Sequence, residues 1–61
     1  MSAQRIERAC EVLHDAYEAA AAEEGWATQE RSRVPWSDVP DANKRTMRRA
    51  VSALLDHLGL P

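Results

Sequence analysis

Apolar and small side chains recur with the period of an α-helix from residue 3 to about residue 24. At about 100° per residue, they fall within one arc of about 140°. These residues are Ile6, Ala9, Cys10, Leu13, Ala16, Tyr17, Ala20 and Ala21. Acidic residues occupy the flank and back of the same helix: Glu7, Glu11, Asp15 and Glu18. Ser2 can cap the first turn with its hydroxyl, and Gly25 can adopt the left-handed conformation that ends a helix. The pattern predicts a helix over residues 3–24.

Residues 26–40 show no helical period. The segment contains Trp26, Pro35, Trp36 and Pro40. A polar stretch, residues 27–33, lies between the tryptophans, and each proline restricts the residue before it to extended geometry. We expect a loop that contains a single helical turn at residues 37–39.

A second helix is predicted over residues 41–58. Its apolar residues recur at i, i+3, i+4, i+7 and i+11: Met47, Ala50, Val51, Leu54 and Leu58. Asp41 is the expected cap, because its carboxylate can accept from free amides and favours the positive end of the helix dipole. Gly59 followed by Leu60 is typical of a Schellman ending.

The predicted architecture is all-α, with one domain over residues 1–61. Two antiparallel amphipathic helices, joined by the tryptophan- and proline-containing segment, would bury their apolar faces against each other. A domain this small normally needs a disulfide, a metal or a partner subunit. The single cysteine excludes an internal disulfide, and no Cys/His cluster offers a zinc site. We therefore expect a homodimer.

Charge and composition restrict the cellular setting. The net charge of −2 argues against a surface built wholly for nucleic acid. No apolar run reaches membrane-spanning length, and the N-terminus lacks a secretion signal, so we expect a cytoplasmic protein without membrane contact. A lone cysteine fits a reducing compartment. The abundance of arginine and alanine favours a bacterial or phage source.

Four side chains are candidates for chemistry or for the core. His14, at the edge of the first apolar stripe, either binds a ligand or packs while hydrogen-bonded to the connecting loop, and packing is the commoner role. Cys10 should be buried, which opposes a nucleophilic role beside His14. Trp26 and Trp36 can stack on an aromatic ligand, but tryptophans in small domains more often close the core.

The second helix carries a basic arc formed by Lys44, Arg45, Arg48 and Arg49. Arg31 and Arg33 in the loop can extend it. Like charges at this spacing repel slightly, so a compensating partner is expected. That partner is either a phosphate-bearing molecule or an acidic protein surface, or the acidic residues of the first helix (Glu11, Asp15 and Glu18).

No enzyme motif is present. The chain lacks a glycine-rich phosphate loop, metal-ligand spacing, a serine elbow and a pair of carboxylates on an apolar face. A helix-turn-helix is also a poor fit, because that motif joins its helices by only a few residues. We expect neither catalysis nor a bound cofactor or metal.

Several short motifs together resemble the RyR domain, the small repeat named after ryanodine receptors. In chain order they are His14-x-x-Tyr17, Gly25-Trp26, Val34-Pro35-Trp36-Ser37-Asp38-Val39-Pro40, an arginine-rich helix, and Leu58-Gly59-Leu60. The resemblance covers about residues 5–60. It departs at residues 27–33, where the family has a longer stretch with an aromatic, a glycine and a His-Pro.

The resemblance implies a non-catalytic module for protein interaction or ligand sensing. The family's repeats pack as tandem pairs about a pseudo-twofold axis, so a single copy would restore the pair as a homodimer. Combined with the residue patterns, the expected ligand-facing residues are His14, Trp26, Arg31, Arg33, Arg45 and Arg48. The alternative is a small nucleic-acid-associated regulator that uses the basic arc.

Overall fold

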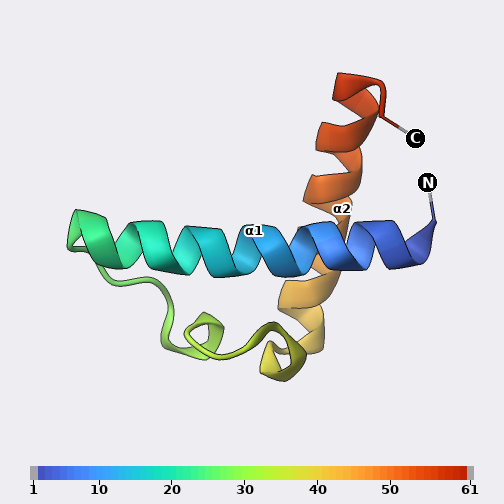
Figure 1. Ribbon diagram of the computed structural model, residues 1–61. Helices are drawn as coiled ribbons and strands as arrows, with labels where there is room; N and C mark the ends of the chain where they lie inside the picture. The colour runs from blue at the N-terminus through green and yellow to red at the C-terminus, as the bar shows by residue number, and fades with distance from the viewer. Residues whose placement is uncertain (1, 61) are drawn as a thin grey trace.

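The structure is a computed structural model that describes residues 2–60. It contains a long helix α1 (Ala3–Glu24), two short 3₁₀ turns η1 (Glu30–Ser32) and η2 (Trp36–Asp38), and a second helix α2 (Asp41–Leu58). The two helices pack against each other, and no strand occurs within residues 2–60. The prediction of an all-helical fold with two long helices is confirmed (Figure 1).

The two helices begin in different ways. Ser2 caps α1 as predicted, because its Oγ accepts a hydrogen bond from the Arg5 amide at 3.3 Å. At α2 the predicted cap was wrong: Pro40 occupies the cap position, and Asp41 is the first helical residue. The extended backbone of Pro40 places its carbonyl to accept from the Lys44 amide at 3.0 Å. Asp41 still places its negative charge in the first turn, where the dipole favours it.

Both helices end in the same way. Gly25 and Gly59 have φ of +79° and +71°, a left-handed conformation that glycine adopts without the steric cost of a Cβ. The amide after each glycine donates to a carbonyl five residues earlier, which is the Schellman pattern. These bonds join Trp26 to Ala21 at 3.2 Å and Leu60 to Leu55 at 3.0 Å. The predicted endings of both helices are confirmed.

The connecting segment contains one helical turn more than the sequence predicted. The turn predicted at residues 37–39 is present one residue earlier, at Trp36–Asp38. A second turn at Glu30–Ser32 was not predicted. Ser32 stabilises this turn, since its amide and its hydroxyl donate to the Gln29 carbonyl at 3.0 and 2.8 Å.

The two helices meet at a crossing, and the C-terminal half of α2 extends past α1 (Figure 1). The core at this crossing consists of Cys10, Trp36, Val39 and Val51. Around it pack the partly buried side chains of Ile6, Ala9, Val34, Met47 and Leu55. The predicted core position of Trp36 is confirmed, and the connecting segment therefore supplies half of the buried cluster.

The buried face of α1 differs from the predicted stripe. Its buried residues are Cys10, His14 and Ala21, whereas Leu13 and Tyr17 are 40 % and 50 % exposed. The buried face of α1 is therefore turned toward His14, relative to the predicted stripe. The reason is that α2 crosses α1 at one place, and the connecting segment covers the side that carries His14. Trp26, for which both core packing and a ligand-facing role were considered, is 51 % exposed and does not close the core.

Three leucine side chains of the two helices remain substantially exposed. Leu13 is adjacent to His14 and so lies about 100° round the helix from it, and it is 40 % exposed. Leu54 and Leu58 belong to the projecting half of α2, and they are 51 % and 57 % exposed. We name these three residues the open leucine face.

No helix in the described part of the chain combines the length and the apolar character that a membrane crossing requires.

Candidate functional site

A groove runs between α1, the connecting segment and α2. It consists of two adjoining hollows of about 440 and 350 Å³. Both are lined by the same four side chains: His14, Gln29, Ser32 and Met47. We name the two hollows together the connecting groove. Its dimensions fall in the range of small-ligand sites in proteins, which begins at about 300 Å³.

His14 forms the buried wall of the groove. It is 6 % exposed, and its Nε2 lies 2.7 Å from the backbone carbonyl oxygen of Val34. A carbonyl can only accept, so Nε2 carries a proton and donates. The ring also lies against Trp36, with centroids 5.8 Å apart. His14 therefore has the packing role that the sequence allowed, holding the connecting segment against α1 while still lining the groove.

Tyr17 and Trp26 form the outer end of the connecting groove. Their ring centroids are 5.8 Å apart, and the rings are nearly perpendicular at 87°. Glu18, the next residue of α1, accepts a hydrogen bond at Oε1 from the Thr28 hydroxyl at 2.7 Å. Tyr17, Glu18, Trp26 and Thr28 all line the smaller hollow. The exposed ring of Trp26 and the carboxylate of Glu18 thus line the same hollow.

A polar cluster is centred on Glu7 of α1. Trp36 Nε1 donates to Glu7 Oε1 at 2.8 Å. Arg48 donates to both carboxylate oxygens, from Nε at 2.7 Å and from Nη2 at 3.2 Å. The bonds from Arg48 and then Trp36 lower the pKa of Glu7 from its usual 4.5 to about 2. Glu7 thus joins α1, η2 and α2.

Sequence reasoning missed Glu7 because it assigned this residue to the flank and back of α1. One signal could have found it. Glu7, Cys10 and His14 are spaced i, i+3 and i+7, which puts all three on one helix face. If the buried face of α1 had been centred on Cys10 and not on Ile6, it would have included the Glu7 carboxylate.

Cys10, one of the four core residues, is fully buried. Burial, followed by the nearby charge of Glu7, raises the pKa of its thiol. Reactive cysteines need an exposed, electropositive site that lowers the pKa. The predicted core role of Cys10 is confirmed, and its environment opposes thiol chemistry.

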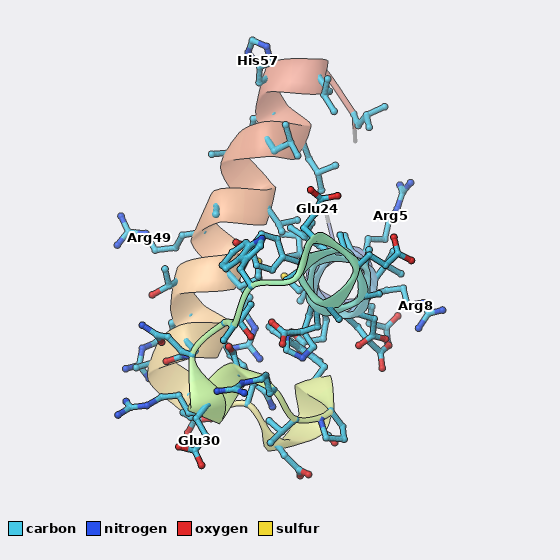
Figure 2. All side chains as sticks on the ribbon, turned by 90° about the vertical axis from the view of Figure 1, so that its left-hand side faces the viewer. Arg5, Arg8, Glu24, Glu30, Arg49 and His57 are labelled. Carbon is cyan, nitrogen blue, oxygen red and sulfur yellow. The ribbon has the colours of Figure 1, made fainter. Side chains whose placement is uncertain are left out.

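The basic arc of α2 divides between internal contacts and solvent. Lys44 donates to the Ser37 carbonyl at 3.1 Å, and its Nζ lies 5.6 Å from the centroid of the Trp36 ring. Arg48 is held by Glu7. Arg45 is exposed, and Arg49 points outward from α2 (Figure 2). The arc is therefore not one continuous cationic surface.

Cross-helix charge pairing occurs, but with a different acid from those expected. The pair between the helices is Glu7–Arg48. The expected partner Glu11 instead pairs with Arg8 of its own helix at 2.6 Å, and Arg8 points away from α2 (Figure 2). The third expected acid, Glu18, bonds to Thr28 of the connecting segment.

The structure brings three of the six expected ligand-facing residues to two hollows that share Trp26. His14 and Trp26 line the same hollow. Arg33 borders a neighbouring hollow that also touches Glu18 and Trp26, whereas Arg31 borders a separate outer hollow. Arg48 lines a hollow at the N-terminal half of α1. The four arginines are thus distributed over several surfaces.

Among the described residues, no group of three or more His, Cys, Asp or Glu side chains is placed to hold a metal ion. Comparisons of the chain with known protein families, curated proteins and solved structures gave no match. The function therefore has to be inferred from the geometry of the chain itself.

Proposed function

We propose that the protein is a non-catalytic interaction and ligand-sensing module, similar to a single RyR repeat, that acts as a homodimer. The connecting groove supports the ligand-sensing part of this proposal. The open leucine face supports the dimer, and it is the observation that carries the proposal.

The surface area of the chain supports a second copy as the occupant of that face. The accessible surface is 4647 Å², whereas a compact monomer of 6.8 kDa exposes about 4,000 Å². The excess of roughly 700 Å² is close to the area of about 800 Å² that each partner buries in a standard interface. The radius of gyration, 12.1 Å, also exceeds the value of about 10.5 Å expected for a compact chain of this length.

The leucines of the open face occur on both helices. A second copy seated there would contact Leu13 of α1 together with Leu54 and Leu58 of α2. Each leucine has 40 % or more of its surface exposed, so covering it adds to the hydrophobic stabilisation. Such an interface would also hold the two helices at their crossing angle. A homodimer thus supplies the core that the small crossing cluster lacks.

Sedimentation velocity over about 1 to 100 µM tests the dimer. We expect the wild-type chain to sediment as a dimer and Leu54→Asp to sediment as a helical monomer. Val12→Asp is the matched control, because Val12 is similarly exposed at 52 % but lies on the back of α1. It should remain dimeric. A wild-type monomer across the whole range would refute the dimer, as would equal dissociation by both variants.

The alternative of a nucleic-acid-associated regulator has less support. Lys44 and Arg48, two of the four cations in the basic arc, already have partners within the chain. Nucleic-acid binding by phosphate contacts needs several free cations and weakens steeply with salt. A salt-dependent mobility shift of duplex DNA would revive that alternative, and no shift at low salt would remove it.

A further inference from the structure

We propose that the Tyr17–Trp26 end of the connecting groove binds a small organic cation, with a methylated ammonium head as the recognised group. This proposal deepens the ligand-sensing role and rests on the proposed function. It follows from the charge of the groove, the geometry of its two aromatic rings and its volume.

The charge of the groove selects for cations. Of the described side chains that line either hollow, Glu18 alone carries a formal charge when His14 is neutral. The Thr28 hydroxyl bonds to Oε1 and holds the carboxylate at the groove wall. A carboxylate has two oxygens with several acceptor positions, so this bond leaves capacity to face a ligand. An anionic ligand would meet repulsion from Glu18.

The two aromatic rings provide a second feature that favours a cation. Tyr17 and Trp26 contact each other and are still 50 % and 51 % exposed. Their perpendicular packing leaves ring surface open to the hollow beside Glu18. The face of an indole is the strongest cation–π acceptor among side chains, and recognition of quaternary ammonium groups by aromatic residues is its best-known use.

The remaining lining gives the groove room for the rest of a ligand. Met47 contributes a polarizable thioether suited to N-methyl groups, and it lines both hollows. Gln29 and Ser32, also common to both hollows, offer polar groups for a hydroxyl or an amide. The hollow of about 350 Å³ beside Trp26 therefore accommodates an ammonium head, while the adjoining hollow takes a short polar tail.

Arg33 opposes this site from the neighbouring hollow. That hollow is lined by Glu18, Trp26, Thr28 and Arg33. A guanidinium there competes with a bound cation for the same carboxylate and ring. Removing its charge should therefore strengthen cation binding, which is the opposite of the result for a phosphate site.

The experiment is a titration of the full chain with choline, followed by the two indole N–H resonances in NMR spectra. We expect the Trp26 resonance to shift more than that of Trp36, which lines the adjoining hollow but whose Nε1 is bonded to Glu7. The neutral isostere 3,3-dimethylbutan-1-ol has the same shape without the charge, and we expect it to bind at least about tenfold more weakly. Inorganic phosphate should cause no shift of the Trp26 resonance.

Three variants separate charge from folding. Glu18→Gln keeps a group that can accept from Thr28 and should weaken choline binding about fivefold or more. Arg33→Ala should strengthen it, and Glu23→Gln, an exposed acid of α1 that lines neither hollow of the groove, should leave it unchanged. The proposal is overturned if choline shifts nothing, if the neutral isostere binds equally well, or if phosphate binds and Arg33→Ala abolishes that binding. Sedimentation of the same samples reports the dimer separately.

Discussion

Replacing Val51 with alanine tests the core at the helix crossing. Val51 is 4 % exposed and packs in the cluster with Cys10, Trp36 and Val39. The change removes two buried methyl groups, each worth about 0.8 kcal/mol of transfer free energy, and leaves a small cavity. We expect a packing loss of about 2 kcal/mol. Alanine forms helix better than valine by about 0.5 kcal/mol, so the net loss should be about 1.5 kcal/mol.

The matched control is the same substitution at Val12, which is 52 % exposed on α1. Val12→Ala gains the same helix propensity without losing a core contact, so its stability should change by no more than about 0.5 kcal/mol. Thermal and urea unfolding followed by circular dichroism provide the measurement. The Val51 variant should melt about 6 to 12 °C below wild type. All samples need equal concentration, because dimerisation couples to stability. Equal shifts for the two variants would refute the crossing core.

Three further predictions concern single residues. Because the folded-state pKa of Glu7 is lowered to about 2, its stabilising effect is present above pH 4.5 and is lost as the pH falls toward 2. Wild-type Tm should therefore drop more steeply than that of Glu7→Gln over this acidic range, and parallel curves would contradict the role of Glu7. The Cys10 thiol should react with Ellman's reagent only at the rate of unfolding, because it is fully buried, and rapid labelling of folded protein would place it at the surface. Gly25→Ala forces a side chain into a left-handed conformation with nothing nearby to clash, so it should cost about 1 kcal/mol, and an unchanged Tm would argue against this helix ending.

The helices and their ends could be predicted because their determinants are local. Ser2 precedes the first turn of α1, and Gly25 and Gly59 each follow the last turn of a helix. Such signals act over one turn of chain and do not depend on the packing of the helices. Asp41 was the exception, because Pro40 was equally able to provide the extended residue before the helix.

The candidate site could be predicted only in part. His14 was recognised as a residue at the edge of an apolar face, with a packing role that the Val34 contact confirms. Two contacts join α1 to the residues that follow Gly25: Tyr17 packs against Trp26, and Glu18 accepts a hydrogen bond from Thr28. Their positions depend on the path that the chain takes after Gly25, and no periodic pattern encodes that path.

The sequence by itself determined the two helices, their limits, the all-helical class and the burial of Cys10 and Trp36. Only the tertiary structure decided which face of α1 is covered. The helices cross instead of lying along each other, so α2 covers Cys10 but leaves Leu13 open, while the connecting segment covers His14. That crossing also brings Glu7 to Arg48, which is 41 residues away in the chain. Helical period fixes which residues share a face, whereas the partner that covers the face is set by contacts between distant segments.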